Sequence, residues 1–390
     1  MDRIRILQKK MIARAIDLAI IMQPRDLYYY AGTAQPCNLL IPAVGEPLLF
    51  VRRAWDFVLK ETRLPHSQLV ESARSSEIAA VVEAYGIACA KIGLTEDAIP
   101  ASIYKKMIDS FPNSEVVNIS PLVLEQRMVK EHQELEWISE AADLFRHAHN
   151  AILKFLRPGV TEIQLSARVL ESVREAGGES IIRNRRWDAS LPPEGLVVST
   201  TNMWRISGHA MTITGVGLSN ALPWGASHTE VVAGDLVVVD MGINLNGYQA
   251  DIARTYVVGS ASSLQLEVFN QVLAIQQVVL DKIKPGVKGK ELYLTAEAEA
   301  KRLGQFQYFQ GYGKMKGHYI GHGIGLELDE PPTLDDKCNV TLVEGMALAI
   351  EPKLIIPQFG GIVIEDDVLV TPTGYRLITP VERCLFEVRG

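Results

Sequence analysis

Long apolar runs are absent from this chain of 390 residues, since no segment holds the roughly 18 consecutive apolar residues of a membrane-spanning helix. Residues 1–22 mix charged side chains into their apolar pattern, which is not the pattern of an export signal. We therefore expect a protein of the cytoplasm that has no membrane partner.

Cysteine is scarce, and its four positions are spread across the whole chain. None of the intervals between them has the spacing of a zinc site, and the disulfide framework of a small secreted protein needs a much denser set. We expect reduced thiols that pack as small apolar residues. The four residues are Cys37, Cys89, Cys338 and Cys384.

Charged residues are also few, and they do not gather in blocks of one sign. They make up 22% of the chain, with a net charge of −7. A nucleic-acid-binding surface requires a basic patch, so we expect no nucleic-acid partner. In contrast, 47% of the residues are hydrophobic, which at this length predicts a large core and two domains.

The sequence changes character near residue 130, where we place a domain boundary. Residues 1–130 alternate helical patterns with short apolar runs, which predicts a small α/β domain with βαβ units and no motif that carries chemistry. A long amphipathic stretch then opens the second domain, residues 131–390, and stops at Arg157-Pro158-Gly159. In the first domain, helices are expected at 3–17, 75–92 and 101–110, and strands at Asp17–Met22 and Pro47–Val51.

The second domain contains an internal repeat. Residues 149–165, HNAILKFLRPGVTEIQL, resemble residues 276–292, QQVVLDKIKPGVKGKEL, in their order of helix, Pro-Gly-Val turn and new helix. The repeat predicts two related halves, each with a helix pair and strands. The helices would cover one side of a shared antiparallel sheet. Helix-Pro-Gly-helix connections are common, so chance similarity is the alternative.

Two aspartates lie in a predicted hairpin at residues 236–258, where β-rich runs flank the turn Asn244-Leu245-Asn246-Gly247. If residues 244 and 247 close the turn, Asp240 faces Asp251. If Asn246 and Gly247 are the central turn residues, Asp251 faces Gly242 and the aspartates are diagonal neighbours. Either register places two carboxylates on one face of the sheet, where they repel unless a cation neutralises them. The alternative is that one aspartate simply faces solvent.

Two glutamates repeat this arrangement at residues 345–371. A three-residue loop at Pro357-Gln358-Phe359 places Glu351 opposite Glu365. The neighbours of all four acids are valine, isoleucine and similar residues, which would be exposed if the acids formed a solvated surface. The two hairpins together therefore favour a buried acidic site.

A histidine completes the candidate site. His322 stands between glycines in Gly321-His322-Gly323, which allows close approach of the backbone. A lone histidine there would more often be a hydrogen-bonded structural residue, but beside four carboxylates it favours two metal ions about 3.5–4 Å apart, with a hydroxide between them as nucleophile. Oxygen and nitrogen ligands without sulfur favour Mn²⁺ or Co²⁺, with Zn²⁺ also possible.

The ordered motifs D-x10-D, G-H-G-I-G, E-P and I-E-D-D resemble the metallopeptidase family of pita-bread fold, which includes methionine aminopeptidase, aminopeptidase P, prolidase and creatinase-like proteins. The resemblance covers the whole second domain. The first domain looks like the creatinase-type N-terminal domain of the aminopeptidase P and prolidase branch. The resemblance implies an α+β chain: a pita-bread catalytic domain with a pseudo-twofold repeat, and a smaller α/β N-terminal domain.

The resemblance also implies roles for the five residues. Asp240, Asp251 and Glu365 would hold one ion, and Asp251, His322, Glu351 and Glu365 the other, with Asp251 and Glu365 bridging. Glu351 would accept the proton of the attacking water. The family further implies hydrolysis of an N-terminal peptide bond, Xaa-Pro substrates in this branch, and a homodimer.

Three positions depart from the peptidase pattern, so the substrate stays open between a short Xaa-Pro peptide and a small non-peptide amide or amidine. Prolidase-like sequences have histidine where this chain has Trp224 and Asp329, and often a basic residue where it has Val363. A binding protein with a vestigial site is a third possibility, which five retained ligands argue against.

Other polar residues could take over the roles of the missing histidines. His318, four residues before His322, and Asp329 are candidate catalytic residues beside Glu351. His209 could reach the cleft that holds the candidate metal ligands, or it could be a packed histidine. The basic run 183–187 is expected to be a solvated loop, or to bring cations to an anionic substrate or a dimer partner.

Overall fold

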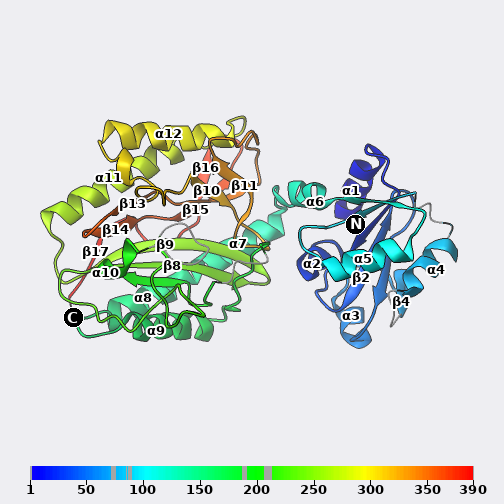
Figure 1. The fold of residues 1–390 in the computed structure, drawn as a ribbon, viewed down its shortest axis with the longest axis horizontal. Helices are drawn as coiled ribbons and strands as arrows, with labels where there is room; N and C mark the ends of the chain where they lie inside the picture. Colours follow the sequence, from blue (N-terminus) through cyan, green and yellow to red (C-terminus); the bar gives the residue numbers. More distant parts are fainter. Residues whose placement is uncertain are drawn as a thin grey trace. The chain divides into compact units, whose positions relative to one another are not determined.

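The computed structural model describes residues 2–71, 76–84, 86, 90–186, 191–205 and 213–389. The chain forms two compact units, Met1–Arg127 and Met128–Gly390 (Figure 1). None of the helices in the described ranges combines the length and the apolar character that a membrane span requires.

The smaller unit is built on a mixed sheet with the strand order β4-β3-β2-β1-β5-β6. Strands β2 and β3 form an antiparallel hairpin, and the parallel pairs β3–β4 and β5–β6 are βαβ crossovers through α3 and α5. Helices α4 and α5 pack against one apolar face. The elements are α1 (Asp2–Ile12), β1 (Leu18–Ile21), α2 (Pro24–Ala31), β2 (Cys37–Pro42), β3 (Leu48–Val51), α3 (Trp55–Glu61), β4 (Leu69–Glu71), α4 (Ser76–Ala84), β5 (Lys91–Leu94), α5 (Ala101–Ser110), β6 (Glu115–Asn118) and α6 (Ser120–Arg127).

Most elements expected in this unit are present. Helix α5 has the expected bounds, and strands β1 and β3 lie inside the expected runs. Helix α1 ends earlier than expected, because Ala15 adopts a left-handed φ of 52° that turns the chain into β1. Cys37, Cys338 and Cys384 are free thiols, and the first two are buried as expected. Cys89 lies outside the described residues.

The larger unit begins with the expected amphipathic stretch, which is divided at Leu144 into α7 and α8. Residues 149–165 and 276–292 correspond to two helix pairs, α8–α9 and α11–α12, so the repeat is confirmed, whereas the strands form separate ladders in place of one shared sheet. The connections are equivalent in detail, since Gly159 N donates to Val231 O and Gly286 N to Leu342 O, both at 2.9 Å. The helices are α7 (His132–Asp143), α8 (Phe145–Phe155), α9 (Glu162–Glu175), α10 (Thr200–Met203), α11 (Ser263–Leu280) and α12 (Gly289–Arg302).

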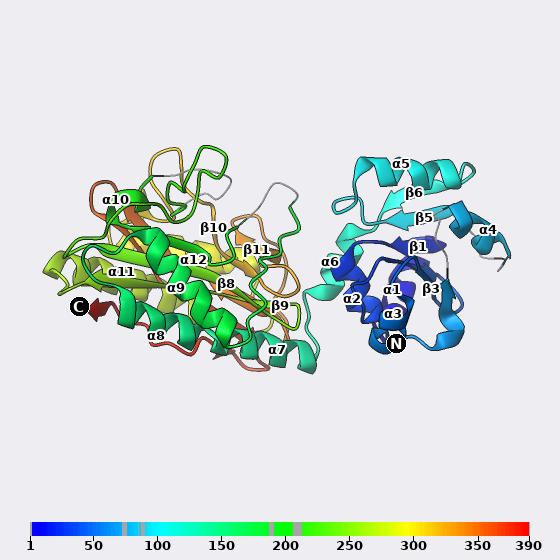
Figure 2. The same ribbon diagram turned by 90° about the horizontal axis from the view of Figure 1, so that it is seen from below.

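The strands of this unit lie between the two helix pairs in Figure 1, and Figure 2 shows α8 and α9 in front of the strands that they cover. The ladders have the orders β17-β9-β8-β7, β11-β10-β12-β15-β16 and β13-β14. The strands are β7 (Leu196–Ser199), β8 (Leu236–Leu245), β9 (Tyr248–Val258), β10 (Tyr319–Gly323), β11 (Glu330–Asp335), β12 (Ala347–Ile350), β13 (Lys353–Ile356), β14 (Gly360–Val363), β15 (Asp366–Val370), β16 (Tyr375–Leu377) and β17 (Phe386–Val388).

Strands β8 and β9 are buried on both faces. Val237 and Val239 pack with α7, α8 and α9. Val238 and Ala253 pack with the core formed by α11, α12 and strands β10 to β15, which make up the second half of this unit. Because side chains alternate along a strand, even-numbered residues of β8 and odd-numbered residues of β9 point towards the second half. Asp240 and Asp251 belong to these two sets.

Candidate metal centre

The hairpin β8–β9 places its two aspartates diagonally. Gly242 lies opposite Asp251, and Asp240 lies opposite Ala253. The direct pairing of Asp240 with Asp251 is therefore wrong, and the second predicted register is confirmed. Its cause is the two-residue turn, because Asn246 and Gly247 both adopt left-handed φ values, 53° and 78°, as a type I′ turn requires.

The second acidic hairpin has the predicted register. Lys353 pairs with Val363, and Ile350 pairs with Asp366. The register makes Glu351 and Glu365 opposite, but both residues lie in the gap between the ladders β13–β14 and β12–β15. Glu365 N donates to Ala253 O of β9 at 3.1 Å, so the two halves of the unit meet at the acidic site.

His322 lies within strand β10, opposite Ala349 of β12. The glycines around it permit this close packing, because a Cβ at Gly321 would lie 2.0 Å from Ala349 O and one at Gly323 would lie 2.4 Å from Pro331 O. Any larger residue at these positions would push β10 away from its neighbours, so the sequence Gly-His-Gly positions the imidazole.

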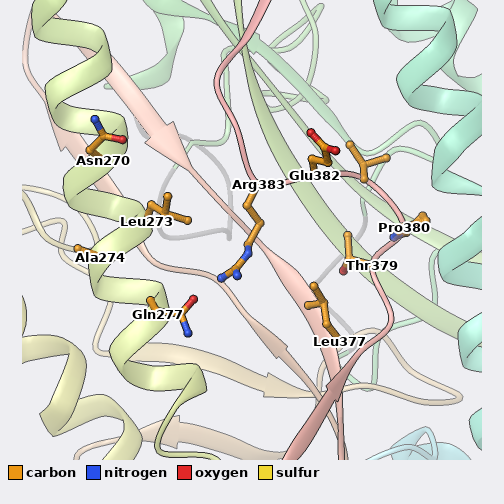
Figure 3. Close-up of a pocket in the computed structure, with 10 residues that line it drawn as sticks. Asn270, Leu273, Ala274, Gln277, Leu377, Thr379, Pro380, Glu382 and Arg383 are labelled. Carbon is orange, nitrogen blue, oxygen red and sulfur yellow. The ribbon is translucent and has the colours of Figure 1, made fainter.

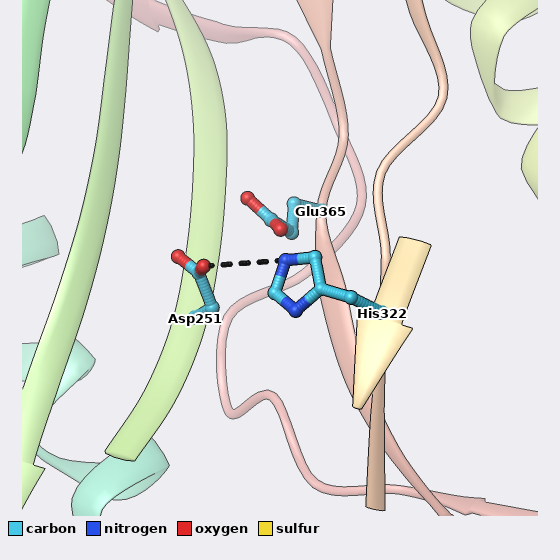
Figure 4. Close-up of side chains that lie close together, drawn as sticks. All are labelled: Asp251, His322 and Glu365. Atoms are coloured by element: carbon cyan, nitrogen blue, oxygen red, sulfur yellow. Dashed lines mark ion pairs between the residues drawn. The ribbon is translucent and has the colours of Figure 1, made fainter. Parts of the chain in front are cut away.

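Three of the five candidate ligands converge. Single ligand atoms of Asp251, His322 and Glu365 all lie within 4.8 Å of one another, and all three residues are buried (Figure 4). His322 Nε2 is 3.7 Å from Asp251 Oδ2 and also 3.7 Å from Glu351 Oε1. Segments far apart in the sequence thus bring three carboxylates around one imidazole.

The carboxylates raise one another's pKa. Burial raises the pKa of Asp251 well above its usual range, and the charges of Asp240 and Asp367 add to the rise. Burial likewise raises the pKa of Glu365, with further contributions from Asp251 and Asp240. Such crowding of buried negative charge is unfavourable unless a cation shares the site.

The pKa values of His322 and of the fourth carboxylate, Asp240, are also shifted by burial and by neighbouring charges. Burial alone would lower the pKa of His322, but Asp329 and Glu351 outweigh it and raise that pKa. Asp240 is half-buried, and its pKa is raised to about 6 because burial outweighs the opposing effect of Lys353.

The donor set fits a divalent cation. Asp251 Oδ1 is buried and accepts no hydrogen bond from any residue that the structure describes, so an oxygen is available for another partner. The cluster offers carboxylate oxygens and one imidazole nitrogen, the set that suits Mn²⁺, Co²⁺ or Zn²⁺. A cation bound there would offset the repulsion that raises the carboxylate pKa values.

A buried lysine in this centre was missed by the sequence reasoning. Lys353, 5% exposed, forms an ion pair with Glu351 Oε2. Burial alone would lower the pKa of Lys353, but Glu351, Asp240 and Glu365 raise it above its usual value. Lys353 is the cross-strand partner of Val363, the position where the resemblance to prolidase-like sequences implies a basic residue. This pairing was the signal that could have identified Lys353, because the register of the hairpin could be predicted from the sequence.

A network of buried polar groups holds the ligands in place. The Arg254 guanidinium donates to Asp366 Oδ1 at 2.6 Å and to Glu365 O at 2.7 Å. Asp367 Oδ2 accepts the backbone N–H of Asp251 at 2.9 Å. Asp251 is thus positioned through its backbone by Asp367, and Glu365 by Arg254, which pairs with Asp366. The double aspartate after Glu365 has a structural explanation in these two contacts.

The two further catalytic candidates differ in position. Asp329 contacts the centre, since its Oδ1 lies 3.2 Å from His322 Nε2. Its side chain is nevertheless 59% exposed. His318 is exposed just before β10 and makes no hydrogen bond or ion pair to the carboxylates within the described ranges. Trp224 is half-buried in the loop before β8. His209 lies outside the described residues.

The described part of the basic run, residues 183–186, is a loop in which Arg183 and Arg186 are exposed as expected and Arg185 is not. Arg183 O accepts the N–H of Leu328 at 2.7 Å, which attaches the segment to the loop that carries Asp329. The Arg185 side chain is 10% exposed and lies 3.7 Å from Glu327. Arg186 is exposed, and Trp187 lies outside the described residues.

An open groove runs between α11 and residues 377–383, with Arg383 extending towards the helix (Figure 3). The Arg383 guanidinium donates to Gln276 Oε1 at 3.4 Å. Gln276 in turn donates to Ile350 O and Ile364 O, each at 3.2 Å. These two carbonyls immediately precede Glu351 and Glu365, so α11 supports the ligand-bearing segments from behind.

Comparisons with known proteins agree with this geometry. The sequence model of "Metallopeptidase family M24" matches residues 136–372, and that of "Creatinase/Prolidase N-terminal domain" matches residues 3–129. An Xaa-Pro dipeptidase of Pyrococcus furiosus is 30% identical over 385 residues, which span 98% of this chain and 99% of that protein.

Solved structures of similar proteins share the whole fold. The Xaa-Pro dipeptidase from Bacillus anthracis superposes with a TM-score of 0.83 at 29% identity, covering 99% of each chain. The prolidase from Pyrococcus horikoshii OT3 superposes with a TM-score of 0.82 at 26% identity, covering 99% of this chain and 100% of that chain.

Proposed function

Because this chain belongs to metallopeptidase family M24, in the branch with a creatinase-type N-terminal domain, we propose that it is a dinuclear Xaa-Pro peptidase. It is a metallohydrolase of pita-bread fold. The buried cluster of Asp251, His322 and Glu365 carries the proposal, since it gathers oxygen and nitrogen donors and crowds negative charge. Relatives of full length named Xaa-Pro dipeptidase or prolidase support the substrate class.

We propose the following ligand roles. One ion is held by Asp240, Asp251 and Glu365, and the second by Asp251, His322, Glu351 and Glu365. Mn²⁺ or Co²⁺ is the expected metal, because no sulfur donor takes part. We also propose residues 1–130 as the N-terminal domain and residues 131–390 as the catalytic domain of a cytoplasmic homodimer. The free thiols of the described cysteines suit a reducing compartment.

The proposed chemistry divides into a metal part and a protein part. When bound, the ions lower the pKa of a water molecule and polarise the scissile carbonyl. Glu351 is proposed to accept the proton of the attacking water, and Lys353 pairs with its Oε2. Asp329, exposed beside His322, is available to the amino group of the substrate. His318 is proposed to contact the substrate from its exposed position just before β10.

A panel of small substrates tests this function. The purified protein is stripped with a chelator, reloaded with Mn²⁺, and given Xaa-Pro dipeptides, Xaa-Pro-Yaa tripeptides, matched Xaa-Ala dipeptides and N-acyl amides. We expect cleavage of the Xaa-Pro bond and little cleavage of the Xaa-Ala bond. Full metal loading without any Xaa-Pro cleavage would refute the proposal. The ratio of dipeptide to tripeptide cleavage separates a dipeptidase from an aminopeptidase.

A further inference from the structure

We propose that Arg183 binds the C-terminal carboxylate of a dipeptide substrate, and that Gln249 holds Arg183 in the position for this contact. The inference rests on the proposed function, because it names the substrate class of the same site. Its basis is an exposed cation on a segment that the chain fixes beside the candidate metal centre. Longer peptides and amidated dipeptides lack a carboxylate at that distance from the scissile bond, so they would bind less well.

Residues 179–183 follow the β8–β9 hairpin away from its turn. Glu179 Oε2 accepts the N–H of Gly247 at 3.1 Å, and Glu179 N donates to Asn244 O at 2.8 Å. Two residues further on, Ile181 O accepts a hydrogen bond from Asn244 Nδ2 at 3.1 Å. Hydrogen bonds to the hairpin thus fix the course of this segment.

The next residue brings the segment to the metal centre. A Cβ at Gly242 would lie 2.8 Å from Ile182 Cδ1 and 2.8 Å from Leu328 Cδ1, so both side chains cover this glycine. Gly242 is the cross-strand partner of Asp251. Ile182 and Leu328 therefore lie over the residue opposite a proposed metal ligand, and Leu328 immediately precedes Asp329 in the chain.

Gln249 fixes the backbone of Arg183. It is fully buried on β9, on the same face of the strand as Asp251. Its Oε1 accepts the N–H of Arg183 at 2.9 Å, and its Nε2 donates to Arg183 O at 3.0 Å and to Leu326 O at 3.3 Å. One buried amide therefore joins the segment of Arg183 to the loop 325–329.

The two joined segments carry opposite charges. Leu328 N donates to Arg183 O at 2.7 Å, which places Arg183 beside the residue that precedes Asp329. Arg183 is exposed, and the Asp329 side chain is 59% exposed. Within the described ranges, Arg183 forms no ion pair and Asp329 pairs with His322 alone. A cation and an anion thus lie on neighbouring segments without pairing with each other.

The next arginine but one has a structural contact that Arg183 lacks. The Arg185 side chain is 10% exposed, and its Nη1 lies 3.7 Å from Oε1 of the buried Glu327. Arg185 therefore helps to hold the loop, whereas the guanidinium of Arg183 is left for a ligand.

A dipeptide matches this pair of charges. It carries an ammonium group at one end and a carboxylate at the other, on either side of the scissile bond. With its ammonium at Asp329, as proposed above, its carboxylate can pair with Arg183. A guanidinium binds a carboxylate through two parallel hydrogen bonds, which fixes the orientation of the substrate as well as its affinity.

Two peptides that differ only at the C-terminus test this inference. Leucylproline and leucylproline amide are given to Mn²⁺-loaded wild type, Arg183→Met, Arg183→Lys, Gln249→Leu and Arg157→Met. Arg157 is the matched control, because it is an exposed arginine in the turn between α8 and α9 and forms no ion pair with a described residue. Thermal unfolding and elemental analysis check that each variant is folded and loaded.

We expect wild type and Arg157→Met to prefer the dipeptide over its amide at least about fivefold in kcat/KM. Arg183→Met should remove most of this preference, through a higher KM for the dipeptide rather than a lower kcat. Arg183→Lys should keep part of it, because lysine retains the charge but not the paired donors. Gln249→Leu should lower the preference although Arg183 is still present.

Four results would count against the account. Equal kcat/KM for the two peptides in wild type would refute carboxylate recognition while leaving the proposed function intact. An unchanged preference in Arg183→Met would exclude Arg183 as the carboxylate ligand. An unchanged preference in folded Gln249→Leu would refute its positioning role, and if this variant does not fold, the Arg183 variants decide the proposal. No cleavage of either peptide at full metal loading would refute the proposed function itself, and the inference with it.

Discussion

The carboxylate of Asp329 lies 3.2 Å from Nε2 of His322. The two side chains differ greatly in exposure, 59% for Asp329 and 7% for His322. The buried cluster of candidate metal ligands is therefore bordered by an exposed acidic group. The resemblance to prolidase-like sequences implies a histidine at this place, so this chain has a carboxylate where an imidazole is expected.

Asp329→Asn is expected to weaken binding of substrates with a free amino group. An exposed carboxylate beside the reaction centre attracts the ammonium of an Xaa-Pro dipeptide, and a charge-assisted hydrogen bond contributes about 1.5–3 kcal/mol. KM should rise about tenfold or more while kcat changes little. Steady-state kinetics measure this, with Asp336→Asn, an exposed aspartate, as control. An unchanged KM would exclude Asp329 from amine recognition.

Asp251→Asn is expected to remove both activity and metal. Asp251 is proposed to bridge the two ions, and even groups one step further from a metal cost 10- to 100-fold when removed. We expect kcat/KM to fall at least about 100-fold and bound metal to fall below two ions per chain, as measured by elemental analysis. A variant that keeps two ions would show that the ligand assignment is wrong.

The metal-free protein is expected to lose stability as the pH rises. Burial raises the folded-state pKa of Asp251 and Glu365, and that of Asp240 to about 6, so ionisation above about pH 4 opposes folding. The raised pKa of His322 acts in the same direction, since its favourable charge is lost at higher pH.

Urea denaturation at several pH values measures this effect. The free energy of unfolding of the metal-free protein should fall by about 1 kcal/mol or more between pH 5 and pH 8. Mn²⁺ loading should flatten the dependence, because the ions take over the charge balance, and Asp251→Asn should reduce it. A metal-free protein that gains stability over this range would contradict the electrostatic description.

Arg254→Met is expected to destabilise the larger unit strongly. The variant leaves Asp366 buried without its partner and frees the carbonyls of Glu365 and Val381, both 2.7 Å from the guanidinium. Breaking a buried ion pair costs about 3–5 kcal/mol. Chemical denaturation measures the loss, and Arg168→Met, which breaks an exposed pair with Glu171, should have little effect. Equal effects of the two variants would argue against this role.

The fold could be predicted wherever local signals are strong. Helix α5 and the second acidic hairpin follow from periodicity and turn chemistry, and the hairpin register was correct to the residue. The first hairpin offered two registers, because Asn244 and Asn246 both suit a turn. The left-handed conformations of Asn246 and Gly247 decided between them.

The site could be predicted only in part, because its support depends on long-range contacts. The candidate ligands are visible in the sequence as charges within apolar strands. Lys353 and Arg254 resemble ordinary charged residues there, and their burial depends on partners in other strands. Arg254 bonds Asp366, which lies 112 residues later in the chain. Local patterns carry no information about such pairings.

The rate of Xaa-Pro hydrolysis as a function of ions bound per chain tests the central claim most directly. Chelated enzyme is reloaded with Mn²⁺ in steps, and both bound metal and initial rate on an Xaa-Pro dipeptide are measured at each step. We predict no turnover without metal and a rate that rises as the sites fill, with no comparable cleavage of the matched Xaa-Ala dipeptide. Equal rates for metal-free and loaded enzyme, or no Xaa-Pro cleavage at full loading, would contradict the proposed function.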